Sequence, residues 1–280
     1  MSGVRTVHRA GGSGPGAAAG RAGSGAVVAV VGLFLALPIV VLVGRAVLGG
    51  GLPAALGSAA VVDALTLSLA TTAASLVLTV IVGTPLAYAL ARRRFPGSTL
   101  LETIVDLPIV LPPSVAGLAL LLVFGRRGLL GEPLDGLGIG IPFTTVAVVL
   151  AQTFVAAPFF IRSARAGLAS VERDLEDAAR VDGASEWQVF RWVTVALAAP
   201  ALAAGVVMAW ARALGEFGAT IMFAGNVAGR TQTLPLVVYG EFQGGDLEAS
   251  IAAAAILVLA AFGVLVAVRA LHWGRALDAR

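Results

Sequence analysis

The sequence predicts an all-α integral membrane protein with six transmembrane helices. Hydrophobic residues make up 58% of the 280-residue chain and charged residues only 12%, and a soluble fold of this length could not bury that much apolar surface. A helix needs roughly 20 apolar residues to cross the hydrocarbon core of a bilayer. Uncharged stretches of suitable length recur at 26–44, 64–91, 107–125, 136–161, 192–211 and 249–268.

The first stretch, 26–44, follows a segment rich in Gly, Ala and Ser. That segment, 1–25, cannot build a core, so we predict a disordered cytoplasmic tail there. The apolar part of a secretory signal is about 7 to 15 residues long. The stretch 26–44 has nineteen uncharged residues and no convincing cleavage site, and it is therefore the first predicted span.

Several of the stretches contain proline, at positions 38, 85, 112, 113, 158 and 200. Proline is tolerated in membrane helices because neighbouring helices can satisfy the carbonyls that it frees. Abundant Ala and Gly would let such helices approach closely. We therefore predict a transmembrane domain over 26–270 and a short cytoplasmic tail at 271–280.

The arginines predict the orientation of the spans. All nineteen basic residues are arginine. With six spans, fourteen of them fall on the side of the two termini and the 162–191 segment, and four fall on the other side, at 45, 126, 127 and 230, with Arg212 at a helix end. Cytoplasmic loops carry the excess of positive charge. Both termini and 162–191 are therefore predicted to be cytoplasmic, and 217–248 external.

Composition also excludes several classes of site. The chain has no cysteine, and its two histidines, His8 and His272, lie near the termini, which excludes disulfides, thiolate or histidine metal sites and a Ser-His-Asp triad. Paired intramembrane aspartates and Gly-x-Ser-x-Gly are also absent, so a membrane-embedded enzyme is not expected. The dispersed arginines and the net charge of +3 argue against nucleic acid as a partner.

A secondary transporter is an alternative from another class. Such proteins often show internal repeats and an ion-coupling carboxylate near the middle of the membrane. The stretches predicted as spans two to six show neither feature.

One cytoplasmic segment, 171–191, has a distinctive pattern. Its first half favours a helix in which Glu176 and Asp177 precede two alanines, and Gly183 is placed to end that helix in the left-handed conformation. Ser185 and Gln188 then form a capping box, which predicts a second short helix that exposes Trp187 and Phe190. An amphipathic helix that lies on the lipid surface is the alternative interpretation.

The order Asp-Ala-Ala-x-x-x-Gly at 177–183 resembles the Glu-Ala-Ala loop of binding-protein-dependent ABC importer permeases. The resemblance implies that 174–191 docks into a groove on an ABC ATPase subunit and that a coupling helix follows Gly183. The residues implied in coupling are Glu176, Asp177, Ala178, Ala179, Gly183, Ala184 and Ser185. Asp replaces the family's Glu at position 177, and Val195-Ala196 replaces its Leu-Pro pair, so that Pro200 is expected to provide the bend a turn later.

Arg212 and Glu216 follow the fifth stretch and are four residues apart. If the chain stays helical there, they share a face and can pair. Charges at membrane depth usually face a protein interior or an aqueous path. The alternative is a simple ion pair that locks a helix end.

The block from Arg212 to Pro235, together with Arg126-Arg127-Gly128 and 107–113, resembles the permeases of molybdate ABC importers. The resemblance extends over 62–270 and implies the type I ABC importer permease fold in a bacterial cell membrane. It also implies that two copies line a pathway, that each docks an ATPase, and that an extracytoplasmic binding protein delivers the oxyanion. The pathway or gate residues are then Arg212, Glu216, Thr220, Asn226, Arg230, Thr231 and Gln232.

ATP is expected to bind a partner subunit, and the chain itself is expected to need no cofactor. The phosphate-binding loop Gly-x-x-x-x-Gly-Lys-[Ser/Thr] requires a lysine, and the chain has none. A permease for sulfate, thiosulfate or tungstate remains an alternative, since charge and number of helices fit these oxyanions equally well.

Overall fold

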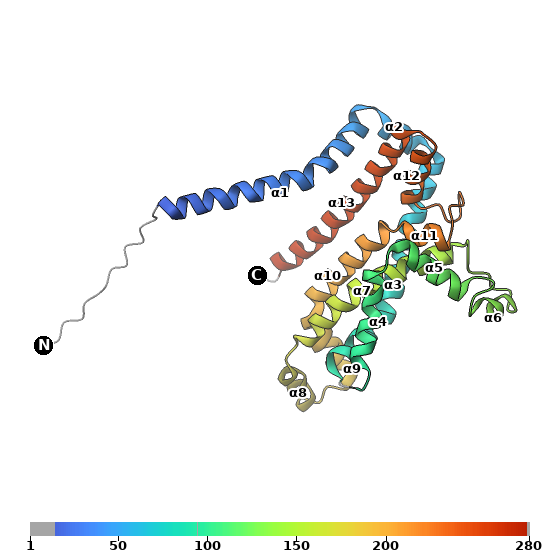
Figure 1. Cartoon of the computed structure of the whole chain (residues 1–280). Coiled ribbons are helices and arrows are strands. Elements are labelled where there is room, and N and C mark those ends of the chain that lie inside the picture. Colours follow the sequence, from blue (N-terminus) through green and yellow to red (C-terminus); the bar gives the residue numbers. More distant parts are fainter. Residues whose placement is uncertain (1–14, 94, 279–280) are drawn as a thin grey trace.

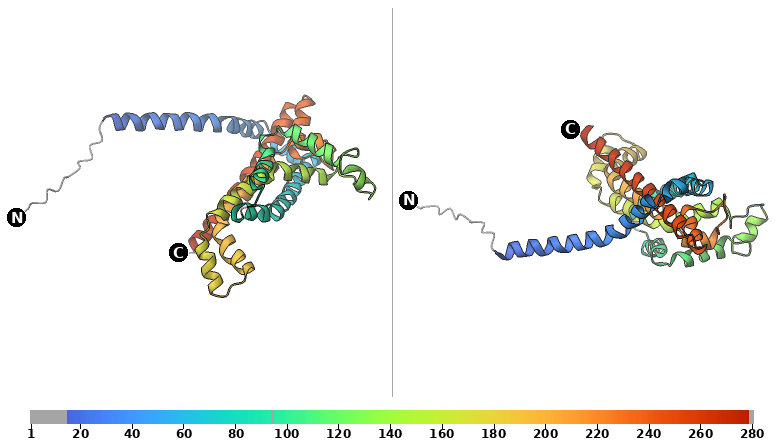
Figure 2. Two further views of the ribbon diagram at one scale, coloured as in Figure 1. Left: turned by 60° about the horizontal axis from the view of Figure 1, so that its bottom comes forward. Right: turned by 90° about the horizontal axis from the view of Figure 1, so that it is seen from above.

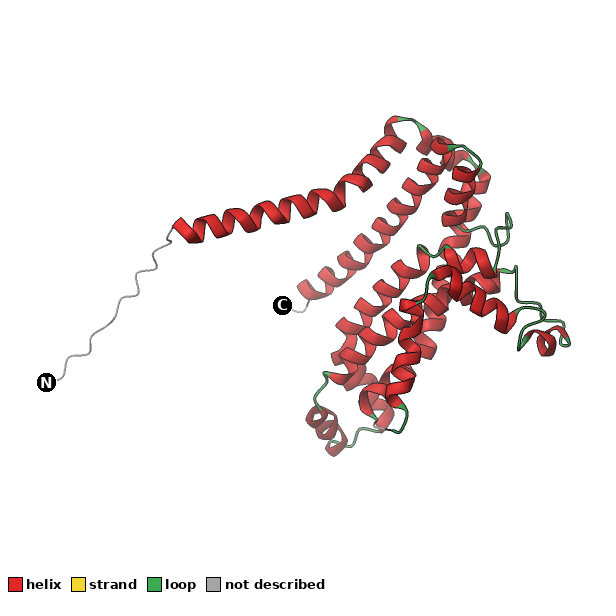
Figure 3. Cartoon of the chain, in the orientation of Figure 1, coloured by secondary structure: helices red, strands yellow, loops and turns green. Residues whose placement is uncertain are grey.

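The computed structural model describes residues 15–93 and 95–278. Within these residues its helices are joined by loops and turns, and no strand is present (Figure 3). The helices are α1 (Pro15–Leu48), α2 (Gly51–Gly57), α3 (Ala59–Arg92), α4 (Ser98–Val110), α5 (Pro113–Phe124), α6 (Gly131–Asp135), α7 (Thr145–Ala169), α8 (Arg173–Val181), α9 (Glu186–Gln188), the π-helix η1 (Val189–Thr194), α10 (Val195–Leu214), α11 (Gly218–Phe223), α12 (Leu234–Gln243) and α13 (Leu247–Asp278).

In the part of the chain that the structure describes, five helical segments are long and apolar enough to cross a membrane: Val27–Leu48, Ala59–Arg92, Thr145–Ala169, Glu186–Leu214 and Leu247–Val266. A sixth crossing is formed if α4 and α5 are counted as one broken span. The predicted disordered tail lies outside the described residues as far as residue 14, and α1 begins at Pro15, within the rest of that segment. Disorder of the first residues stays a prediction.

The prediction of one continuous third span at 107–125 was wrong. α4 and α5 meet at an angle of 119°, because Leu111 is extended and Pro112 and Pro113 follow it. Proline disfavours helical backbone at the preceding residue and suits the first position of a new helix. α4 also begins earlier than predicted, at Ser98.

Because α4 begins at Ser98, the broken span contains two carboxylates, Glu102 and Asp106, that lie outside the predicted stretch 107–125. Glu102 lies 2.9 Å from Arg165 of α7 and Asp106 lies 3.5 Å from Arg162, so α4 and α7 are joined by two ion pairs near the α8 end of the molecule.

The fourth predicted span, 136–161, was displaced. α7 begins only at Thr145, because the Oγ1 atom of Thr144 accepts a hydrogen bond from the Ala147 N–H and caps the helix. The preceding residues, which include Gly136, Gly138 and Gly140, form a loop. α7 then continues past residue 161 to Ala169.

The core of the molecule is the bundle of α3, α7 and α10. Phe160 of α7 is 1% exposed and lies between two glycines on the neighbouring helices. A Cβ atom on Gly83 of α3 would lie 2.9 Å from the Phe160 ring, and one on Gly205 of α10 would lie 3.2 Å from the Phe160 carbonyl oxygen. Small residues therefore let all three helices close around one aromatic side chain.

Several of the other helices lie at the two ends of the bundle. α8 and α9 lie together at one end, whereas α2, α12, α5 and α6 lie toward the other (Figure 1). α1 extends away from the bundle in each view and contacts α13 and α2 (Figure 2). The two predicted functional segments, 171–191 and 212–235, therefore lie toward opposite ends of the bundle.

Candidate functional site

Gly183 makes the predicted corner after α8. Its φ angle is +92°, in the left-handed region, as the sequence predicted. The Gly183 N–H donates to the Arg180 carbonyl at 3.0 Å and the Ala184 N–H to the Ala179 carbonyl at 3.0 Å, which closes the helix end. A Cβ atom on Gly183 would meet nothing within 4 Å. The requirement for glycine is therefore one of backbone conformation and not of space.

The predicted capping box is also present. The Ser185 N–H donates to Oε1 of Gln188 at 2.8 Å, and the Gln188 N–H donates to Oγ of Ser185 at 3.4 Å. Trp187 is 65% exposed, as expected. Exposure of Phe190 was predicted and is wrong: the ring is half-buried and packs edge-on against Tyr88 of α3, with centroids 5.2 Å apart. The second short helix is thereby joined to α3.

Glu176 points into the protein. Its Oε1 atom lies 2.8 Å from Nη2 of Arg92 and accepts a 2.6 Å hydrogen bond from the Thr194 hydroxyl. The Arg92 and Glu176 side chains are 9% and 6% exposed, and Arg92 also donates to the Val171 carbonyl at 3.0 Å. The cluster of Arg92, Glu176 and Thr194 joins the end of α3, α8 and η1. Of its three members, sequence reasoning identified only Glu176.

Asp177 points away from the protein and its side chain is 68% exposed. Arg180 lies 2.6 Å from Asp177 and 2.7 Å from Glu186, so it links α8 to α9 across the Gly183 corner. The hydrogen bond to Glu186 is the main reason that the pKa of Arg180 is raised above its ordinary value. Glu176 and Asp177, both predicted as coupling residues, therefore have different contacts: Glu176 is buried against α3 and η1, and Asp177 is exposed beside Arg180.

The rest of the predicted coupling set lies on the outside of the loop. Ala178 and Ser185 are exposed, and Ala179 and Ala184 are half-buried. Two apolar side chains that the sequence did not single out accompany Trp187: Leu175 is 47% exposed and Val181 is 88% exposed. The loop therefore exposes small and apolar side chains beside its charged ones.

The predicted pairing of Arg212 with Glu216 is confirmed. Nη1 of Arg212 lies 2.6 Å from Oε2 of Glu216, whose side chain is 1% exposed. The helix does not continue through the pair: α10 ends at Leu214 and α11 begins at Gly218. The other Glu216 oxygen, Oε1, accepts a 2.7 Å hydrogen bond from the Ala219 N–H in the first turn of α11. Glu216 therefore holds two helices together at a break.

The other predicted gate residues fall into two groups. Thr220 is fully buried on α11, near the ion pair in sequence. Asn226, Arg230, Thr231 and Gln232 lie in the loop before α12. Thr231 is buried and supports this loop, because its Oγ1 atom accepts from the Val227 N–H at 2.9 Å. Asn226 and Arg230 are exposed.

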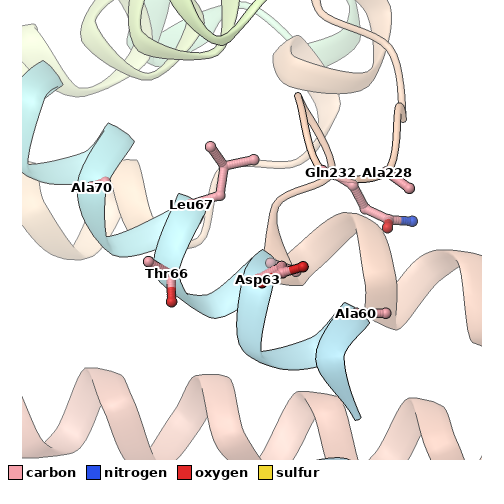
Figure 4. Close-up of a pocket in the computed structure, with 9 residues that line it drawn as sticks. Ala60, Asp63, Thr66, Leu67, Ala70, Ala228 and Gln232 are labelled. Carbon is pink, nitrogen blue, oxygen red and sulfur yellow. The ribbon is translucent and has the colours of Figure 1, made fainter.

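Gln232 lines an open cavity of about 640 Å³ between this loop and α3. Figure 4 shows Gln232 and Ala228 on the loop, across from Asp63 and Leu67 of α3. The two groups of predicted gate residues thus have different surroundings, one at the α10–α11 break and one in a surface loop.

No group of His, Cys, Asp and Glu that could hold a metal ion is present among the described residues.

Comparison with known proteins gives one family. Residues 83–273 match the family described as "Binding-protein-dependent transport system inner membrane component". The matched segment contains the Gly183 corner, the cluster around Glu176 and the α10–α11 break.

Individual relatives are closely similar in sequence. The chain is 44% identical over 167 residues to the putative molybdenum transport system permease protein YvgM of Bacillus subtilis, covering 59% of this chain and 74% of that protein. It is 42% identical over 187 residues to the molybdenum transport system permease protein ModB of Escherichia coli K12, and the match covers 66% of this chain and 82% of that protein. Identity to the sulfate transport system permease protein CysT of Escherichia coli K12 is 37% over 192 residues, covering 69% of each.

A solved structure has the same fold. The chain superposes with a TM-score of 0.69 on a chain of a bacterial alginate ABC transporter, solved in complex with an alginate pentasaccharide-bound periplasmic protein. The superposition covers 88% of this chain and 91% of that chain. Sequence identity is 17%, so this likeness concerns the fold alone. It confirms the predicted all-α architecture of a type I importer permease.

Proposed function

Because the chain belongs to the family of binding-protein-dependent transport system inner membrane components, we propose that it is the membrane-spanning permease subunit of an ATP-driven importer of molybdate. The observation that carries the choice of substrate is the identity of 44% and 42% to two molybdenum permeases, against 37% to a sulfate permease. The matched family segment, 83–273, covers most of the helical bundle.

In this proposal both termini and α8 are cytoplasmic, and the loops beside α5, α6 and α11 face the outside. The excess of arginine on the α8 side supports this orientation, including Arg92, Arg93, Arg173 and Arg180. The separation of α8 and α9 from α5, α6 and α12 (Figure 1) is consistent with it. The membrane is that of a bacterial cell, as for the named relatives.

The exposed outer face of α8 and α9 would dock an ABC ATPase, which binds the nucleotide. Apolar Leu175, Val181 and Trp187 give this face the composition of a protein contact, in which aromatic residues carry much of the binding energy. Asp177 and Arg180 already satisfy one another within the loop, so the face can be buried without stranding either charge.

Transport would follow from movement of that face. Two copies of the chain form the pathway, and an extracytoplasmic binding protein delivers the oxyanion. ATP binding draws the two ATPases together, and with them both α8–α9 units. Since Arg92, Glu176 and Thr194 join α8 to α3 and η1, both helices would follow, and the pathway would turn outward. The Arg212–Glu216 pair would act at the external gate.

The test is uptake into proteoliposomes that contain the permease and its ATPase, with the binding protein and labelled molybdate outside. ATP-dependent uptake of molybdate that excess sulfate does not abolish is expected. Uptake of sulfate, thiosulfate or tungstate in preference to molybdate would assign the chain to one of those substrates. Uptake that follows an ion gradient and needs no ATPase would identify a secondary transporter instead.

A further inference from the structure

A second cavity at the α5–α6 end is lined by arginine. This cleft has a volume of about 690 Å³ and lies between the loop that precedes α7 and the loop that precedes α12. Its lining includes Leu121, Gly125, Arg126, Pro142, Thr144 and Arg230. Arg126 and Arg230 are 104 positions apart in the sequence and line the same cleft.

The two loops are fixed to one another. The Thr145 hydroxyl donates to the Arg230 carbonyl at 2.9 Å, and the Phe143 N–H donates to the Phe223 carbonyl of α11 at 3.4 Å. Gly225 has a φ of +72°, and a Cβ atom there would lie 2.9 Å from the Phe143 ring. The cleft is therefore a formed feature of the fold, next to the helix that Glu216 caps.

The charges in this cleft are unusual for its surroundings. Neither Arg126 nor Arg230 forms an ion pair with any of the residues that the structure describes, and no carboxylate lines the cleft. Two other cavities at this end do contain carboxylates. One is lined by Asp63, and the other by Glu241, Asp246 and Glu248. An anion would therefore be drawn to the cleft between the two arginines.

We propose that this cleft is a receiving site for a tetrahedral divalent oxyanion, which binds there after release from the delivering protein and before it passes the Arg212–Glu216 pair. The proposal rests on the proposed function. Guanidinium groups present several N–H donors in a fixed plane, and such charge-assisted hydrogen bonds suit the oxygens of an oxyanion. The bound anion would also relieve the repulsion between two like charges that share the cleft.

The test uses the complete complex in proteoliposomes, with saturating binding protein and radiolabelled molybdate. Arg126→Gln and Arg230→Gln each remove one charge and keep an amide donor. Each is expected to slow uptake about tenfold, the loss that corresponds to one good charge-assisted hydrogen bond. Arg127→Gln is the matched control, because Arg127 is exposed like its neighbour Arg126 but does not line the cleft. It should leave uptake unchanged.

A second measurement separates the anion from the protein that delivers it. The affinity of the complex for the binding protein should be the same in all three variants, and Arg126→Lys and Arg230→Lys should restore part of the uptake. Loss of that affinity would show that the arginines bind carboxylates of the delivering protein. That result, or uptake in both glutamine variants equal to that of Arg127→Gln, would overturn the proposal.

Uptake by the wild-type complex tests the proposed substrate separately from the receiving site. If it carries sulfate and no molybdate, the proposed substrate fails, and the same variants are compared with labelled sulfate. The receiving site then predicts the same tenfold loss.

Discussion

Arg92, the last residue of α3, holds Glu176 of α8 at 2.8 Å in a site where both side chains are nine-tenths buried or more. The Thr194 hydroxyl shares the same carboxylate oxygen. A buried ion pair is costly to break because the remaining charge has no solvent. The contact therefore ties the proposed ATPase-docking loop to the bundle in a way that an exposed ion pair could not.

The first prediction concerns this contact. Arg92→Met and Glu176→Gln should each destabilise the protein by ~3 to 5 kcal/mol, since each strands a buried charge or polar group, and the double variant should be less destabilised than the sum. Thermal unfolding in detergent measures this. Arg93→Met is the control, because Arg93 is exposed and forms no ion pair within the described residues. Additive losses would show that Arg92 and Glu176 act separately.

A second prediction concerns the corner at Gly183. Gly183→Val should leave the protein folded but reduce substrate-stimulated ATP hydrolysis to its basal rate, because a left-handed conformation costs a residue with a Cβ atom roughly 1 to 2 kcal/mol. Gly183→Asn should keep most of the stimulation, since Asn tolerates positive φ. A Cβ atom has open space there, so crowding within the subunit cannot explain a difference between the two variants. Full stimulation in the valine variant would leave the loop as a plain surface helix.

The third prediction concerns Arg212 and Glu216. Glu216→Ala should be more harmful to transport than Arg212→Ala. Glu216 also accepts the Ala219 N–H, so its removal leaves two groups, the Arg212 guanidinium and that N–H, without a partner. The double variant should be milder than the sum of the two single changes, as expected for side chains in contact. Uptake rates for the four proteins give the comparison. Strict additivity would mean that the 2.6 Å contact has no energetic consequence.

The fourth prediction tests orientation. The chain has no cysteine, so single cysteines can be introduced without background labelling. Ser185→Cys should react with a membrane-impermeant maleimide only from the cytoplasmic side. Leu137→Cys, at a residue 74% exposed in the loop before α7, should react only from the outside. Labelling of both from one side would contradict the six-span arrangement.

Periodicity and local chemistry predicted a large part of this structure. The lengths of the apolar stretches located the five long apolar helices of the described residues, though not the start of α7, and the Gly183 corner and Ser185 capping box followed from short-range rules. Local rules could not show that Glu176 turns inward and Asp177 outward, because that depends on Arg92, which is 84 residues away. The Phe190 contact with Tyr88 likewise depends on how α3 packs. The break between α4 and α5 could have been found, since two adjacent prolines signal it.

The close fit of Phe160 between Gly83 and Gly205 determines how force can travel through the protein. Because interlocked helices resist sliding past one another, α3, α7 and α10 behave as a lever rather than as independent rods. α3 has 34 residues and is therefore about 50 Å long, with Arg92 at one end. A tilt of roughly 5° about that end would carry Ala59 some ~4 Å sideways, by the same helix dimensions. If the proposed ATPase moves the Arg92 end of α3, a short stroke there would be amplified at the Ala59 end.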